Sequence, residues 1–317
     1  MRRLTIAIII GMAVYAACAG VPSGLLPESL GEARLVRVYE GDEATRLLGA
    51  DQTLSAALSE FKPRAIRGGV YNYGGITIHL GIARLASCDE AYGVYSALTA
   101  MPRERWPYAA GEISYRSPYL AGQAGDYAFW FTSPTNPQTY ASFYRTHGEA
   151  ILAALAGKTS KKPCSYHWKI LPEENRYADS VVYIKSREEN GVRIYHAYAA
   201  AYQAKRNLAR IYVMRYDSEI DALDRYSREK ARLASSGASP ADFTPMPGTP
   251  MQSFVWTTGS GVDVFCQYRW ICIYIHDMPD KAYAASFVRA AFKNMSLIRD
   301  EALSQTQRWN DDKKAPL

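Results

Sequence analysis

Histidine is the first residue type to consider for chemistry, because its side chain can ligate a metal or transfer a proton near neutral pH. The five histidines are scattered along the chain: His79, His147, His167, His196 and His276. None belongs to an H-E-x-x-H motif, so the spacing supports no metal site. His276 and Asp277 place a base beside a carboxylate, but neighbours on a strand point to opposite faces and no G-x-S-x-G motif accompanies them. We therefore expect no catalytic residue, no metal and no cofactor.

The N-terminal segment has the pattern of a secretory signal. It starts with basic residues, continues as an apolar stretch over Leu4 to Val14 that is too short to span a bilayer, and ends in two alanines before Cys18. This pattern is typical of a bacterial lipobox, so we predict a signal peptide over residues 1–17 and lipidation of Cys18. Tyr15 stands where leucine is usual, and cleavage by ordinary signal peptidase after Ala19 is the alternative.

Lipidation would determine where the protein resides. Two acyl chains anchor a protein stably, because each buried methylene contributes about 0.8 kcal/mol. Ala19, rather than aspartate, follows the cysteine, which favours the outer membrane. The expected partners are therefore the membrane, through the lipid anchor, and a protein or glycan of the envelope.

Export past the cytoplasmic reductants allows disulfides among the four remaining cysteines. Cys266 and Cys272 flank residues 267–271 in an expected hairpin and can pair across it, which leaves Cys88 for Cys164. The alternative is that Cys266 and Cys272 are small buried strand residues, which the alternation of apolar residues partly favours. No C-x-x-C motif occurs, so neither a thioredoxin-like site nor covalently attached haem is indicated.

Tyrosine is in excess, with 24 residues beside 6 tryptophans and 9 phenylalanines. Aromatic rings stack on sugars or peptides while their hydroxyls hydrogen-bond, so an exposed recognition face is one explanation. Its candidate residues are Tyr71, Tyr73, Tyr127, Trp130, Tyr198 and Tyr202. The simpler explanation is packing, because tyrosine is favoured in strands. Tyr71 and Tyr202 stand at matching hairpin positions, which shared ancestry of two halves also explains.

Composition bounds the class of protein. The chain has 317 residues, 48% of them hydrophobic and 21% charged, which is enough for two cores of ordinary domain size. The formal net charge is +6. No cluster of lysine and arginine like those that neutralise phosphates occurs, so we expect no nucleic-acid partner.

Three short patterns occur twice in the same order. Leu26-Pro27-Glu28 recurs as Leu171-Pro172-Glu173, Glu90-Ala91 with Tyr95-Ser96 as Asp221-Ala222 with Tyr226-Ser227, and Ala141-Ser142-Phe143 as Ala285-Ser286-Phe287. The offsets are 145, 131 and 144 residues, and two compensating length changes explain the drift. We infer a duplicated module. The predicted organisation is a first module over 24–156, a linker over 157–169, a second module over 170–298 and a flexible tail over 299–317.

Hydrophobic periodicity gives the elements of the first half. We predict a helix over Leu54 to Phe61 capped by Asp51 or Thr53, a hairpin turning at Gly74-Gly75, a helix opened by Asp89 and Glu90, strands over Glu112 to Leu120 and Tyr127 to Thr132, and a helix over Gln138 to Ala156. The second half repeats this order with changes. The offset falls by fourteen between the first two landmarks, and Arg187 to Gly191 has a turn composition, so the first helix is predicted to be missing there.

Hairpins with helices laid across them predict an α+β fold in each half, with a mainly antiparallel sheet covered by helices on one face. The last helix is expected over Asp280 to Ile298, because the apolar periodicity ends there. No alternating strand-helix-strand pattern requires a parallel sheet.

The first half resembles a known family. Ala56 to Phe61, the Tyr71 to Gly75 hairpin and the run Asp89 to Ser96 resemble the domain of unknown function 6599 family, whose members read A-x-L-x-E-[YF], a Tyr-Gly hairpin and D-x-x-x-A-[YF]-G-[AV]-[YF]. The resemblance covers about residues 24–156. In the second half Asp224 and Arg225 replace the Gly-Val pair, and membership is inferred through the duplication. The resemblance implies an exported bacterial protein and brings no activity or catalytic residue.

Together these patterns predict an exported envelope lipoprotein, non-catalytic, that binds or scaffolds at a membrane surface. One alternative is a secreted hydrolase whose site assembles from distant residues. The other is a subunit of a larger envelope assembly that makes contacts through exposed sheet edges.

Overall fold

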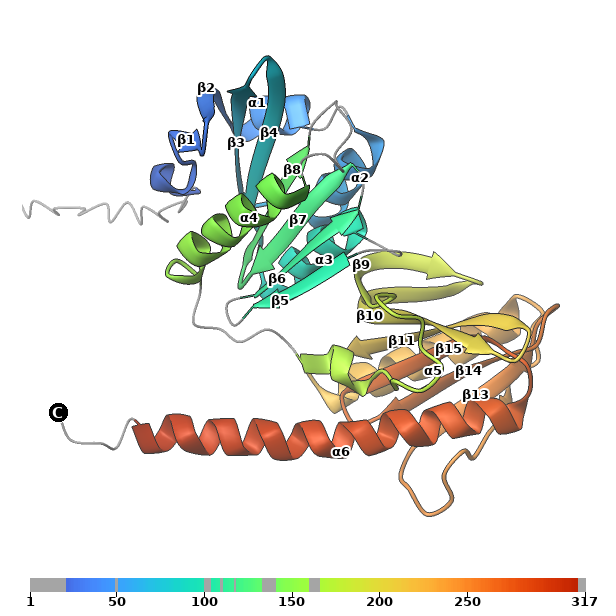
Figure 1. Cartoon of the computed structure of the whole chain (residues 1–317). Coiled ribbons are helices and arrows are strands. Elements are labelled where there is room, and N and C mark those ends of the chain that lie inside the picture. Colours follow the sequence, from blue (N-terminus) through green and yellow to red (C-terminus); the bar gives the residue numbers. More distant parts are fainter. Residues whose placement is uncertain are drawn as a thin grey trace, which may run out of the picture.

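A computed structural model describes residues 21–48, 51–99, 104–108, 111–116, 118–132, 141–159 and 166–312. Each half of the chain forms one antiparallel sheet packed with helices (Figure 1). The α+β class expected from the sequence is confirmed. The first sheet has eight strands in the order β1-β2-β3-β4-β8-β7-β6-β5, and the second has seven in the order β12-β13-β14-β15-β11-β10-β9.

The first module begins with a short 3-10 helix, Ser23–Leu25, and ends with the helix α4. Its strands are β1 (Ser29–Leu30), β2 (Ala33–Glu40), β3 (Ala65–Tyr73), β4 (Ile76–Arg84), β5 (Glu104–Tyr108), β6 (Gly111–Arg116), β7 (Tyr119–Ala124) and β8 (Tyr127–Thr132). Its helices are α1 (Gly41–Leu48), α2 (Gln52–Phe61), α3 (Cys88–Thr99) and α4 (Ala141–Ala156). The Asp51 carboxylate caps α2 by accepting hydrogen bonds from the amides of Thr53 and Leu54, as its sequence predicts.

The second module follows a 3-10 helix, Tyr166–Ile170, that occupies the end of the predicted linker. Its strands are β9 (Val182–Glu189), β10 (Val192–Ala204), β11 (Asn207–Arg215), β12 (Ala241–Asp242), β13 (Gln252–Thr257), β14 (Val262–Tyr268) and β15 (Ile271–Met278). Its helices are α5 (Glu219–Ser235) and α6 (Lys281–Asp312). No helix in the described part of the chain is both long and apolar enough to cross a membrane.

The two sheets have the same topology. The order β2-β3-β4-β8-β7-β6-β5 in the first corresponds strand by strand to β9-β10-β11-β15-β14-β13-β12 in the second. The registers agree as well, because Tyr71 pairs with Ile78 across the first hairpin and Tyr202 pairs with Ala209, each 131 residues later. This arrangement is the one that a duplicated module would produce.

The predicted deletion in the second module is confirmed. In the first module α1 and α2 lie between β2 and β3, whereas β9 turns directly into β10. Asn190 and Gly191 form this turn with φ of 46° and 75°. Positive φ at both central residues matches the right-handed twist of a two-residue hairpin, and asparagine and glycine tolerate it best.

Helices cover both faces of each sheet, so the expectation of one covered face is wrong. On β7, Ala121 packs in the same hydrophobic cluster as α3, and its neighbour Leu120 packs with α4. On β14, Cys266 packs with α6, and Phe265 packs with α5. Strands with apolar residues on both faces need cover on both faces.

The last helix is longer than predicted. We expected it to end near Ile298 and to be followed by a flexible tail, but α6 continues to Asp312 (Figure 1). Residues 299–312 hold no glycine or proline and are rich in good helix formers. The apolar periodicity of a sequence indicates which part of a helix can pack against a core. It does not indicate where the helix ends.

Candidate functional site

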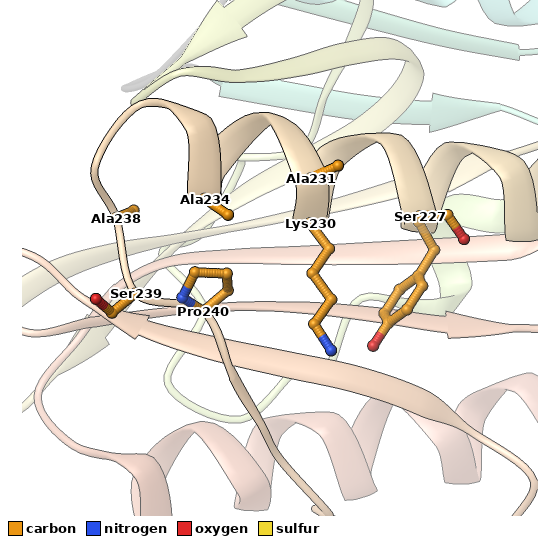
Figure 2. Close-up of a pocket in the computed structure, with 8 residues that line it drawn as sticks. Ser227, Lys230, Ala231, Ala234, Ala238, Ser239 and Pro240 are labelled. Atoms are coloured by element: carbon orange, nitrogen blue, oxygen red, sulfur yellow. The ribbon is translucent and has the colours of Figure 1, made fainter.

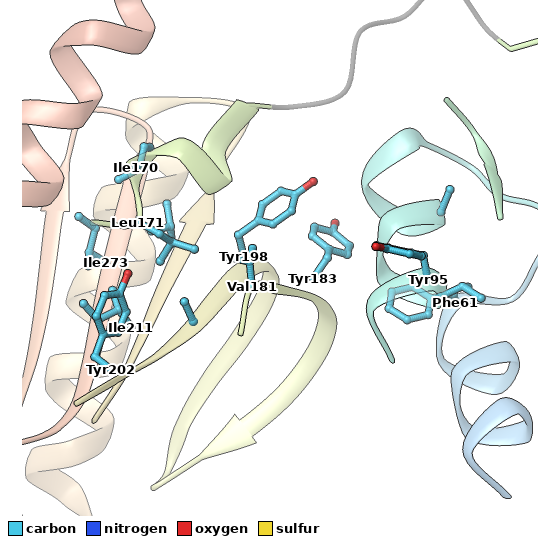
Figure 3. Packing of buried hydrophobic residues seen from close by; sticks show 14 of the residues in the cluster. Phe61, Tyr95, Ile170, Leu171, Val181, Tyr183, Tyr198, Tyr202, Ile211 and Ile273 are labelled. Carbon is cyan, nitrogen blue, oxygen red and sulfur yellow. The ribbon is translucent and has the colours of Figure 1, made fainter. Parts of the chain in front are cut away.

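The two modules meet where α3 of the first lies against β9 and β10 of the second. Tyr183 on β9 and Tyr198 on β10 are buried, and their rings lie 5.1 Å apart. Tyr183 also contacts Phe61 at the end of α2, and Tyr198 contacts Tyr92 on α3. Through these rings the buried residues of both modules form one continuous hydrophobic cluster, which Figure 3 shows. We call this contact the seam.

Hydrogen bonds from one stripe of α3 fix the seam. The Tyr198 hydroxyl donates to the Asp89 carboxylate at 2.6 Å, and the Tyr92 hydroxyl donates to the carbonyl of Val181 at 3.2 Å. The amide of Tyr183 donates to the Ser96 hydroxyl at 3.3 Å. Burial, reinforced by the Asp89 charge, raises the pKa of Tyr198 well above its usual value, so this hydroxyl keeps its proton.

Lys185 on β9 makes two further polar contacts across the seam. Its ammonium lies 2.7 Å from the Glu90 carboxylate and its amide donates to Glu60 at 3.0 Å. The Glu90 side chain is only 7% exposed. Removing the lysine would be costly, because it would leave the buried Glu90 carboxylate without its partner.

A cleft of about 450 Å³ opens beside the seam. Its lining comes from both modules: Ser87, Asp89, Tyr183, Tyr195, His196, Tyr198, Arg215, Tyr216, Asp217 and Asp221. Ligand sites are often found at such junctions between two folded units. Three of these side chains are carboxylates and one is a guanidinium, so the lining disfavours an anionic ligand.

An irregular stretch of β10 presents the aromatic part of this cleft. His196 has φ of 47°, an uncommon conformation for a residue with a side chain. Ile194 and Ala197 consequently face the same hydrophobic cluster although they are three residues apart. Tyr195 and His196 therefore both point out of the sheet, and Tyr195 is 38% exposed. A hydrogen bond of 2.9 Å joins the Tyr183 hydroxyl to His196 Nδ1.

A second concavity, of about 570 Å³, lies along the later turns of α5 (Figure 2). Ser227, Lys230 and Ala234 of the helix face the loop around Pro240. The Lys230 ammonium is already paired with Asp242 at 2.5 Å. The other lining side chains are mostly small, so this groove has fewer groups than the cleft with which to recognise a polar ligand.

His276 has a carboxylate partner, but a different one from its neighbour Asp277. The buried Asp263 lies 3.0 Å from His276 Nδ1 and also accepts from the Tyr274 hydroxyl, the Asn190 amide group and the Asp277 backbone amide. Within the described residues, no serine or cysteine hydrogen-bonds to His276. Asp263 lies on β14 and links it to the β9–β10 turn and to β15, so the cluster stabilises the second sheet. We call Asp263 and its four hydrogen-bond partners the clasp.

The expectation that these aromatic residues form an exposed face is wrong for most of them. Tyr71, Trp130 and Tyr202 are fully buried, Tyr127 is buried, and Tyr73 is half-buried against Phe143. Both faces of each sheet are covered, so alternation placed these rings inside. Of the six candidates, Tyr198 alone lines the cleft.

Sequence reasoning missed Tyr195, His196, Asp217 and Asp221. One signal was available, because the apolar alternation of Val192 to Ala199 changes phase at Tyr195 and His196. A phase change within a strand indicates an irregularity, and such irregularities occur near functional sites.

The proposed Cys266–Cys272 disulfide is wrong. Both thiols are free and buried, and they lie on opposite faces of the sheet, because Cys266 pairs with Ile273 while Cys272 pairs with Gln267. Cys88 is disulfide-bonded. Its predicted partner Cys164 lies outside the described residues, so that pairing stays a prediction.

Among the described residues, no group of three or more histidine, cysteine, aspartate or glutamate side chains is arranged to hold a metal. Comparison with family models, with curated proteins and with solved structures finds no match to this chain. The resemblance to the domain of unknown function 6599 family stays a prediction.

Proposed function

We propose that this protein is an exported envelope lipoprotein that binds a saccharide, without catalysis, in the cleft beside the seam. The observation that carries the proposal is the lining of the cleft. An exposed Tyr195 ring stands at its rim, with His196, Arg215 and the carboxylates of Asp89 and Asp221 around it.

These groups suit a neutral, polyhydroxylated ligand. A sugar ring packs its C–H face on an aromatic side chain, while its hydroxyls donate to carboxylates and accept from a guanidinium. The excess of carboxylates in the lining disfavours phosphates and acidic peptides. A glycan of the envelope fits both this chemistry and the export signal predicted from the first residues.

Binding can be tested by calorimetric titration with neutral N-acetylglucosamine oligomers of increasing length. We expect Tyr195→Ala to weaken binding about tenfold, which corresponds to the loss of one aromatic contact. Tyr177→Ala is the matched control, because Tyr177 is 37% exposed and lies outside the cleft. Equal losses in both variants, or no heat of binding with any of the saccharides, would contradict the proposal.

The lipid anchor is tested separately, because Cys18 lies outside the described residues. Wild-type protein should partition with membranes and be extracted only by detergent. Cys18→Ser should be released in soluble form. A Cys18→Ser protein that still fractionates with membranes would exclude lipidation as the anchor without affecting the saccharide test.

A further inference from the structure

The outer face of α3 forms part of the surface of the first module that the second module covers. Asp89, Tyr92 and Ser96 stand at spacings of three and four residues, which places them on one face of the helix. All three hydrogen-bond to the second module. This face is therefore a docking face.

The same face of α5 is bare. The offset of 131 residues relates α3 to α5 and places Ile220, Leu223 and Ser227 at the positions of the docking face. Ile220 is 78% exposed and Leu223 is 38% exposed. We call these three residues the α5 face. An aliphatic pair on the outer side of a surface helix is unusual, because that side is normally polar.

The other side of the seam also has a counterpart. In the second sheet, Tyr183 on β9 pairs with Tyr198 on β10. In the first sheet, Glu40 on β2 pairs with Arg67, and Arg67 corresponds to Tyr198 through the offset of 131 residues. β2 therefore holds in the first sheet the place that β9 holds in the second. Val181, two residues before Tyr183, accepts the hydrogen bond from α3.

β2 is left uncovered where β9 is docked. Val38 lies two residues before Glu40, just as Val181 lies two residues before Tyr183, so Val38 corresponds to Val181. Val38 is 37% exposed. A register shift between Leu35 and Arg37 turns Val36 outward as well, and it is 66% exposed. Figure 1 places β2 at the end of the first module that is remote from the second. We call Val36 and Val38 the β2 edge.

The α5 face and the β2 edge are complementary in charge and polarity. Each presents two exposed aliphatic side chains. The exposed acids Glu219 and Asp221 flank the α5 face beside the Asp224–Arg228 ion pair, and the exposed Arg34 flanks the β2 edge beside the Arg37–Glu43 ion pair. Charge of opposite sign around two apolar patches favours their association in one orientation.

We propose that a second copy of this chain docks its β2 edge on the α5 face, and that the contact repeats the seam between molecules. The groove in Figure 2 supports this, because Ser227 lines it and so extends the α5 face into a hollow. The contact joins two different surfaces, so each bound copy leaves one of each kind free. Such head-to-tail contacts build rings if the rotation closes and filaments if it does not.

Sedimentation velocity of the full chain in detergent tests this proposal, with three variants that circular dichroism must show to be folded. The first carries Ile220→Asp with Leu223→Asp, and the second carries Val36→Asp with Val38→Asp. The third, Leu208→Asp, is the control, because Leu208 is 52% exposed near the start of β11 and belongs to neither surface.

We expect wild type and the Leu208 control to form oligomers larger than dimers as concentration rises. Each double variant alone should associate at least tenfold more weakly. An equimolar mixture of the two should form a dimer and nothing larger, because each supplies the surface that the other lacks. Monomeric wild type at every concentration, self-association of either double variant, or a mixture that stays monomeric would overturn the proposal.

Discussion

Tyr71 and Tyr202 make the same hydrogen bond in the two modules. Each donates its hydroxyl to the carbonyl of the proline in the Leu-Pro-Glu pattern, Pro27 or Pro172, at 2.9 Å in both cases. Each ring is fully buried. A repeated pattern that indicated the duplication therefore contacts the matching tyrosine in each module, and the bond fastens the chain entering the module to β3 or to β10.

We expect Tyr71→Phe and Tyr202→Phe each to lower the free energy of unfolding by about 1 kcal/mol, because each leaves a proline carbonyl without its partner. The two effects should add in the double variant, since the residues lie in different sheets. Urea unfolding measures this. Tyr268→Phe is the control, because no hydroxyl hydrogen bond is found for Tyr268 in the described residues, and its change should be a few tenths of a kcal/mol. Strongly unequal losses for Tyr71 and Tyr202 would argue against equivalent roles.

The missing helix explains a difference between α3 and α5. A Cβ atom on Gly93 would lie 2.3 Å from the Phe61 ring of α2, so only glycine allows α2 to pack there. The second module has no counterpart of α2, and Asp224 stands in place of Gly93. Asp224 is exposed and pairs with Arg228 one helical turn later. Loss of one element has thus turned a tightly packed position into a solvated one.

Alanine at these two positions should have effects of very different size on stability. Gly93→Ala must push Phe61 aside and should destabilise the protein by about 2 kcal/mol, a typical cost of overpacking. Asp224→Ala removes only a surface pair and should change stability by about 0.5 kcal/mol or less. Thermal unfolding of both variants checks this. A stabilised Gly93→Ala protein would mean that helix propensity outweighs the clash.

Local patterns predicted much of the fold because they report local physics. The Gly74-Gly75 and Asn190-Gly191 turns and the Asp51 cap depend on residues close together in sequence, and all three are present. The repeated landmarks predicted the arrangement of two similar sheets, although the strands β1, β2, β5 and β12 were not foreseen. The single strand predicted over Glu112 to Leu120 is wrong, because this stretch spans β6 and the start of β7, which pair with each other.

The site could not be predicted in the same way. Alternation shows that Tyr71 and Trp130 each lie on one particular face of their own strand, but it does not show what covers that face. The seam joins Asp89 to Tyr198, which are far apart in sequence, and no spacing rule relates them. The conformation at His196 that creates the aromatic rim depends on backbone geometry that histidine seldom adopts.

The free cysteines give a chemical test of the fold. Burial raises the pKa of Cys266 to about 12 and raises that of Cys272 as well, so neither thiol ionises near neutral pH. We expect neither to react with Ellman's reagent in the native protein, and both to react in urea. Rapid reaction of either thiol under native conditions would contradict its burial. Cys88 should react only after reduction.

The clasp around Asp263 makes stability depend on pH. The hydrogen bond to Asp263 raises the pKa of His276 above its ordinary 6.5, against the opposing effect of burial. Burial alone would raise the pKa of Asp263, but hydrogen bonds from His276, the Asp277 amide, Tyr274 and Asn190 lower it below 3.8. Stability from the histidine is complete below pH 6.5 and is lost as pH rises through its folded pKa. Stability from the aspartate is complete above pH 3.8 and is lost as pH falls through its folded pKa.

The pair should therefore stabilise the protein most between pH 3.8 and pH 6.5. His276→Asn keeps a donor toward Asp263 but cannot ionise. Its deficit relative to wild type, measured by urea unfolding, should be largest near about pH 5 and shrink toward about pH 8, where the wild-type histidine is becoming neutral. Asp263→Ala leaves four donors without their acceptor and should cost about 3 kcal/mol or more. A His276→Asn deficit that is constant from about pH 5 to about pH 8 would show that ionisation of His276 contributes nothing to the clasp.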